Sequence, residues 1–241
     1  MSIVFKLIKK LIVAIFSLIV TGVIVFLLWR VVSSGDPKAM KTIDVNDRVS
    51  AAYESVGEGL YMFKQDQRSI TSGNDNYGYF SITDYRIIPD ANQIQTTVRY
   101  NNSTLKYTAQ DYELDEIPSR EDDVYDVTLV IAVDLTPENQ DDNLGNDEAG
   151  VEFIRCHGST TLSDAKNMYN YRKMVFQLDD ADVDISKLMD EGILLAIYAD
   201  FYYVGDVDYD KTPYGTLCLY DFKTEDIVIK LEKRDIKALE E

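Results

Sequence analysis

The longest apolar run of the chain begins at Leu11 and ends at Trp29, and it contains no charged residue. At a helical rise of about 1.5 Å per residue, this run reaches roughly 28 Å, close to the ~30 Å hydrocarbon core of a bilayer. A signal-peptide core is usually shorter, about 7–15 residues, and a small-residue cleavage site follows it. Here Arg30 follows instead. The pattern predicts a membrane-spanning signal-anchor helix over residues 11–32.

The basic residues next to this run predict its orientation, because Lys and Arg are preferentially retained in the cytoplasm. The first ten residues contain Lys6, Lys9 and Lys10 and no acidic residue. Three basic residues also follow the run, but they are soon followed by many carboxylates. We therefore expect residues 1–10 to be a short cytoplasmic leader and the remaining chain to be extracytoplasmic.

The next stretch, residues 33–77, reads as a linker that contains a short amphipathic helix. Apolar residues recur there at helical spacings of three and four, and Asn46 or Asp47 can cap the first turn. Gly57 and Gly59 weaken a helix, so the second half has a strand as its alternative. The apolar positions are Val49, Ala52, Tyr53, Val56, Leu60 and Phe63.

From residue 78 to 232 the apolar period changes to two, which is typical of strands with one buried face. Turns separate these segments, so we expect a mainly β domain, an antiparallel β-sandwich of immunoglobulin-like or similar type. The segment at 184–192 reads as one capped helical turn, and 233–241 as a charged tail. The expected strands span residues 80–88, 94–100, 104–114, 126–135, 151–156, 174–178, 193–203, 215–222 and 227–231.

The resemblance to immunoglobulin-like and fibronectin-like sandwiches is architectural. In such sandwiches a short helical turn often crosses between the sheets, as the 184–192 segment would. The Cys, Trp, Cys pattern of antibody domains is missing, since Trp29 is the single tryptophan.

Charge restricts the partners of this domain. The formal net charge is -18, and all 42 acidic residues follow residue 35 together with 20 of the 24 basic ones, so that part carries −22. Such a surface repels nucleic acid and anionic phospholipid and attracts cations or basic polymers. The simpler interpretation is that the acidic surface keeps the domain soluble.

The sequence contains no recognisable catalytic motif. Cys156 and His157 are adjacent, but neighbours on a strand point to opposite faces, so they cannot form a dyad. Cys156 shares its face with Ile154, which predicts a core position. A Cys156–Cys218 disulfide and two free thiols are both compatible with the pattern.

Two acidic loops raise calcium binding as an alternative to simple solvation. The candidate ligands are Asp206, Asp208 and Asp210, and a second acid-rich loop spans residues 138–148. Neither loop matches the EF-hand pattern, which needs Gly at its sixth position and Glu at its twelfth. A calcium site would therefore be assembled from separate loops, with the carboxylates of Asp179, Asp180, Asp182 and Asp184 as further candidates.

Tyrosines offer a second candidate surface. Aromatic rings with a polar edge suit carbohydrate or peptide binding, although Tyr is also a common strand residue. The residues concerned are Tyr198, Tyr202, Tyr209, Tyr214 and Tyr220.

Together these patterns predict a membrane-anchored, non-enzymatic binding or structural module that contacts a protein, a cell-wall polymer or a membrane subunit. No cofactor is expected apart from the calcium alternative. Two alternatives remain: a cell-surface hydrolase that uses paired carboxylates, and a calcium-dependent adhesion-type domain.

Overall fold

The computed structural model describes residues 2–33, 37–57, 60, 63–65, 80–119, 122–134, 150–166 and 169–221. The chain divides into two compact units, Met1–Asp36 and Pro37–Glu241. The acidic loop at 138–148, the strand expected at 227–231 and the charged tail at 233–241 lie outside the described residues.

The first unit is the helix α1 (Ser2–Ser33). Within it, Ile8–Trp29 is long and apolar enough to cross a membrane, and a signal sequence near the N-terminus would meet the same criterion. Its large apolar side chains are solvent-exposed, up to 75% for Leu18. Such a surface is unfavourable in water and favourable in lipid. The predicted apolar helix is confirmed, whereas its orientation stays a prediction.

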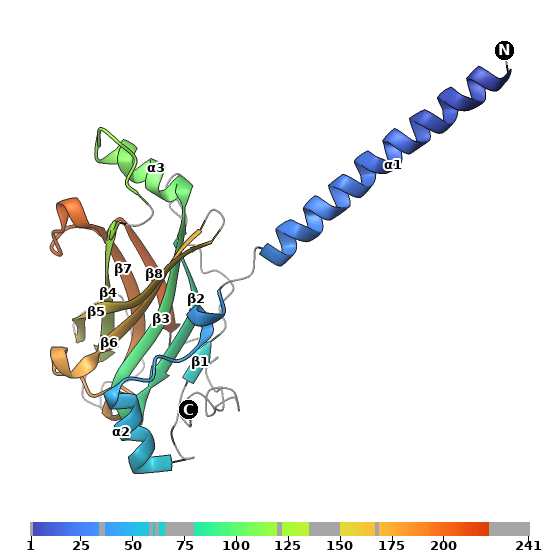
Figure 1. Cartoon of the computed structure of the whole chain (residues 1–241). Coiled ribbons are helices and arrows are strands. Elements are labelled where there is room, and N and C mark those ends of the chain that lie inside the picture. Colours follow the sequence, from blue (N-terminus) through green and yellow to red (C-terminus); the bar gives the residue numbers. More distant parts are fainter. Residues whose placement is uncertain are drawn as a thin grey trace, which may run out of the picture. The chain divides into compact units, whose positions relative to one another are not determined.

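The second unit is built on one antiparallel sheet (Figure 1), so the prediction of a mainly β domain is confirmed. The strands follow one another in the order β1-β2-β3-β6-β5-β4-β7-β8. Their bounds are β1 (Phe63–Gln65), β2 (Phe80–Ile88), β3 (Gln93–Asn101), β4 (Tyr125–Asp134), β5 (Val151–Lys166), β6 (Tyr169–Gln177), β7 (Leu194–Tyr203) and β8 (Gly215–Asp221).

The long strand β5 joins two halves of this sheet. Its residues 151–157 pair with β4, and its residues 158–166 pair with β6. The change of partner occurs at Gly158, where a Cβ atom would lie 2.4 Å from Cε1 of Phe176. We call β1, β2, β3, β6 and residues 158–166 half-sheet A, and residues 151–157 with β4, β7 and β8 half-sheet B.

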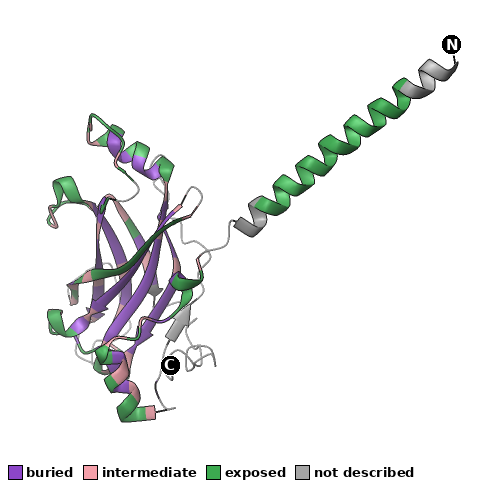
Figure 2. Ribbon diagram, in the orientation of Figure 1, coloured by how far each residue is buried: buried purple, intermediate pink, exposed green. Residues whose placement is uncertain are grey.

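The two halves enclose one apolar core, and the sheet is nearly barrel-like. Phe80 of β2 stacks on Phe201 of β7 with ring centroids 4.1 Å apart, although these strands lie far apart in the sheet order. Buried residues follow the strands in Figure 2. Because β5 makes the sheet continuous, the expected two-sheet sandwich of immunoglobulin-like type is not confirmed.

Short helices connect and cover the strands. Their bounds are η1 (Lys38–Lys41), α2 (Asp47–Val56), η3 (Pro89–Ala91), α3 (Asn102–Asp111), η4 (Leu178–Ala181), α4 (Ile185–Asp190) and η5 (Val204–Asp206). Asn46 caps α2 by accepting hydrogen bonds from the amides of Arg48 and Val49, as predicted. The predicted turn at 184–192 is α4, with Asp184 as its N-cap.

One predicted strand is wrong. Residues 104–114 were expected to be extended, but α3 covers most of them. A capping box explains the helix: the Asn101 side chain accepts from the Thr104 amide at 2.9 Å, and the Thr104 hydroxyl accepts from the Asn101 amide at 3.4 Å. The buried Leu105, Thr108 and Ala109 then lie on one helical face.

Replacing Gly158 with Ala tests whether close packing at this position allows β5 to change partners. The new methyl group would collide with the Phe176 ring, so we expect the free energy of unfolding to fall by about 1–3 kcal/mol in urea titrations of the detergent-solubilised chain. Ser159→Ala, at the exposed next position, should change it by about 0.5 kcal/mol or less. Equal stability of the Gly158→Ala variant and the parent would contradict this role.

Candidate functional sites

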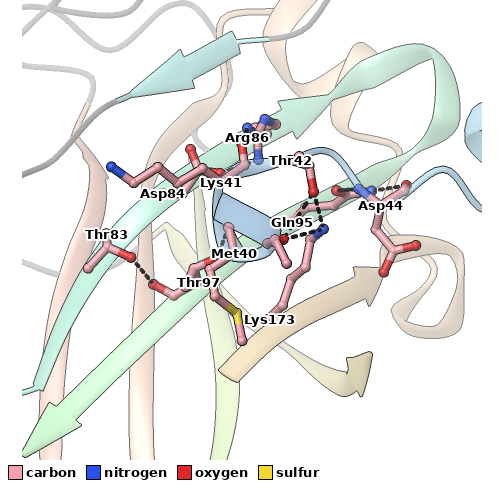
Figure 3. Close-up of polar contacts among 11 residues, drawn as sticks. Met40, Lys41, Thr42, Asp44, Thr83, Asp84, Arg86, Gln95, Thr97 and Lys173 are labelled. Carbon is pink, nitrogen blue, oxygen red and sulfur yellow. Dashed lines mark hydrogen bonds and ion pairs between the residues drawn. The ribbon is translucent and has the colours of Figure 1, made fainter. Parts of the chain in front are cut away.

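Part of the outer face of half-sheet A, on β2, β3 and β6, is covered by residues 37–44, which we call the juxtamembrane segment (Figure 3). The sheet contacts mainly the backbone of this segment. The Thr97 hydroxyl donates to the Met40 carbonyl at 2.7 Å, and the Arg86 guanidinium donates to the Lys41 carbonyl at 2.5 Å. Gln95 donates to the Asp44 carbonyl at 2.8 Å and accepts from the Asp44 amide at 2.7 Å.

Charged groups are buried beneath this segment. Arg86 and Asp84 form an ion pair, and each residue is 2% exposed. Lys173 is 6% exposed, and its ammonium contacts the Ala39 carbonyl at 3.5 Å and the Thr42 hydroxyl at 3.4 Å. Burial lowers the pKa of Lys173, and the nearby Asp44 opposes this shift. Removing such charges from water is costly, so this face differs from an ordinary apolar contact.

The chain that follows the juxtamembrane segment packs differently, through a small apolar cluster. Asn46 donates to Gln93 at 3.0 Å, and Arg48 forms an ion pair with Asp179. The apolar cluster comprises Ile43, Val49, Ala52, Leu60, Ile88 and Ala91, with Tyr53 against it.

The outer face of half-sheet B is organised by Arg155. Its guanidinium donates to the Tyr209 carbonyl at 3.0 Å and to the Tyr202 hydroxyl at 3.4 Å. It also lies over the Tyr209 ring, 5.3 Å from the centroid. The His157 ring packs edge-on against the same Tyr209 ring, with the ring centroids 5.0 Å apart. We call Arg155, His157, Tyr202, Tyr209 and Asp126 the Arg155 patch.

Asp126 fixes the orientation of Tyr209 in this patch. The Tyr209 hydroxyl donates to the Asp126 carboxylate at 2.5 Å, and this bond raises the pKa of Tyr209 to about 12. A neutral phenol is therefore held against a carboxylate beside a guanidinium. This combination can bind a polar ligand through both a ring face and hydrogen bonds.

The structure separates the predicted tyrosines. Tyr202 and Tyr209 are in contact, with ring centroids 5.1 Å apart, and Tyr198 lies on the same face of β7 as Tyr202. Tyr214 lies elsewhere, against Tyr125, and donates to Asp111. The side chain of Tyr220 is outside the described part. Sequence reasoning missed Arg155 and Asp126 as patch residues, although period two assigns them to the outer faces of their strands.

In the acidic loop that contains Asp206, Asp208 and Asp210, the positive charge of Lys211 lies close to two of the carboxylates. The Lys211 ammonium lies 3.6 Å from an Asp206 oxygen and 3.5 Å from an Asp208 oxygen, and the Asp210 amide donates to Asp208. Of the other candidates, Asp179 accepts from Asn92 as well as from Arg48, and Asp184 caps α4. The described residues contain no group of three His, Cys, Asp or Glu side chains arranged for a metal. Calcium binding stays a prediction.

The two cysteines are not bonded to each other, and they lie on opposite faces of half-sheet B. Cys156 is 1% exposed in the core, where burial raises its pKa to about 11. Cys218 pairs with Tyr198 in the ladder and shares its outward face. His157 is exposed on the outer face, so the prediction that Cys156 and His157 point apart is confirmed.

The most buried acid of this face is Asp200. Burial raises its pKa, and the Thr216 hydroxyl donates to it at 2.7 Å. Thr128 and Thr216 lie directly opposite it, and Asp126 lies one pair further along β4 on the same face, so the paired-carboxylate alternative stays a prediction.

No family model, curated protein or solved structure matches this chain.

Substitutions of two buried charged residues beneath the juxtamembrane segment should change the free energy of unfolding differently. Asp84→Ala removes the nearest carboxylate from a buried guanidinium and should lower the free energy of unfolding by about 3–5 kcal/mol. Lys173→Met removes a buried charge without separating an ion pair, so it should be neutral or stabilising by about 1 kcal/mol. Urea unfolding of the detergent-solubilised full chain measures both. Equal losses in the two variants would contradict this distinction.

Proposed function

We propose that this chain is a single-pass membrane protein that displays a non-enzymatic binding module outside the cytoplasm, and that the Arg155 patch is its ligand-binding surface. The observation that carries the proposal is the convergence of Arg155, Tyr202 and Tyr209 from β5, β7 and the following loop. Guanidinium groups and tyrosine rings dominate the centres of many binding surfaces.

The two outer faces of the sheet support this assignment. Part of half-sheet A is covered by the chain's own juxtamembrane segment, whereas half-sheet B presents an exposed His157 and a Phe153 that is 58% exposed beside Arg155. Aromatic residues and Arg are enriched at binding interfaces.

Charge disfavours an anionic polymer as the ligand. The acidic chain repels anionic polymers, while tyrosine rings can stack on the apolar faces of sugars and the surrounding Arg155, Asp126 and His157 can bond their hydroxyl groups. We therefore propose a neutral glycan of a cell surface or cell wall.

The extracytoplasmic location rests on the basic residues before α1 and is tested by labelling. In a variant without native cysteines, Ser159→Cys should react with a membrane-impermeant maleimide on intact cells, because residue 159 is exposed. Ser2→Cys, in the leader, should react only after lysis. The reverse pattern would place the domain in the cytoplasm and exclude a cell-surface ligand.

The Arg155 patch is tested with the full-length protein in detergent, by cosedimentation with insoluble chitin, cellulose or peptidoglycan. We expect one of these polymers to retain the protein, and Tyr209→Ala to weaken binding about tenfold, since a lost ring contact of ~1.4 kcal/mol has that effect. Arg155→Ala should also weaken it.

The matched control is Tyr107→Ala, which removes a tyrosine that is 39% exposed on α3, away from the patch. It should bind as the parent does. Failure of all three polymers to retain the protein would refute the proposed ligand, and equal binding by Tyr209→Ala would refute the proposed surface.

A further inference from the structure

Residues 37–42, which precede α2, contact the sheet mainly through polar groups. Residues 37–42 are held through three of their backbone carbonyls and one hydroxyl, by Arg86, Thr97 and Lys173. Met40 is the one residue of this stretch whose side chain is fully buried. Beyond it, Ile43 joins the apolar cluster of α2.

The sheet face beneath residues 37–42 is compatible with water. Arg86, Thr97 and Lys173 are buried and bond to this segment, and Asp84 is buried beside Arg86. Charged and hydroxyl groups of this kind are hydrated when they become exposed. Release of the segment would allow water to solvate the charged groups and would restore conformational entropy to six backbone residues. These two gains offset the free energy lost when the hydrogen bonds break and the Met40 side chain becomes exposed. By contrast, release of α2 would expose Val49, Ile88 and Leu60, which water disfavours.

We propose that residues 37–42 form a releasable latch between the membrane helix and the domain, which opens while α2 stays docked. We call the chain between the end of α1 at Ser33 and the closed latch the tether. In the open state the six latch residues join the tether and add at most about 20 Å of reach, at 3.3–3.6 Å per extended residue. The latch thus sets how far the domain can move from the membrane.

The position of the latch supports this role. Any force that separates the domain from its anchor acts first on residue 37, because this is where the chain from α1 first contacts the sheet. The hydrogen bond from Asn46 to Gln93 and the ion pair between Arg48 and Asp179 lie behind it and retain α2. Opening therefore ends at Ile43, where the apolar cluster of α2 begins.

Hydrogen–deuterium exchange on the full-length protein in nanodiscs tests the latch. Amides of residues 38–42, including Met40, which donates to the Pro37 carbonyl at 3.0 Å, should exchange through local opening, at least tenfold faster than those of residues 50–55 in α2. If the two segments are protected equally and open together, the latch does not exist and residues 37–42 are a permanent part of the domain.

A pair of threonine variants provides the second measurement. Thr97→Val removes the donor to the Met40 carbonyl, and a hydrogen bond of about 0.5–1.5 kcal/mol corresponds to roughly two- to tenfold faster exchange of residues 38–42. Exchange in α2 should not change. Thr96→Val is the matched control: this neighbour points into the core, and its hydroxyl has no hydrogen-bond partner among the described residues. Equal effects of both substitutions, or acceleration in α2 as well, would overturn the proposal.

Discussion

The fold depends on one steric constraint in β5. This strand must pass from β4 to β6 while Phe176 stays in the core, and only a residue without a side chain fits at Gly158. The close approach lets a single sheet curve until Phe80 and Phe201 meet. The core, the two outer faces and the surfaces they display all follow from this curvature.

The two outer faces of the sheet differ in what their side chains contact. Half-sheet A has a charged and polar face that the chain itself covers, so its side chains bond to backbone carbonyls of residues 39–41 and 44 rather than to water. Half-sheet B leaves Phe153 and His157 in solvent and gathers Tyr209 and Arg155 between them. A domain that covers one polar region with its own chain and leaves an aromatic patch in solvent is suited to presenting a surface.

Local patterns in the sequence predicted the elements whose structure depends on local chemistry. The apolar helix, the alternation in β4 and β7, and the caps at Asn46 and Asp184 needed no tertiary information. The exception is α3, where Thr and Tyr residues have a high strand propensity and the capping box at Asn101 was overlooked. Propensity was misleading because the cap determined the backbone there.

Features that depend on distant residues could not be predicted in this way. The polar side chains of Asp84, Arg86 and Gln95 read as solvent-facing, since nothing local shows that a segment some 45 residues earlier lies over them. The Arg155 patch likewise needs the register of three strands and the course of the loop that carries Tyr209. For the same reason, the five predicted tyrosines could not be sorted into those that meet and those that do not.

The opposite orientation of the two thiols has a consequence for how the protein matures. Because Cys156 lies in the core and Cys218 faces outward, no covalent bond between them supports the sheet. Apolar burial, hydrogen bonds and ion pairs hold the described domain together, so its folding needs neither an oxidant nor an isomerase for a bond between these cysteines. The chain can reach its native state in a reducing or an oxidising compartment alike.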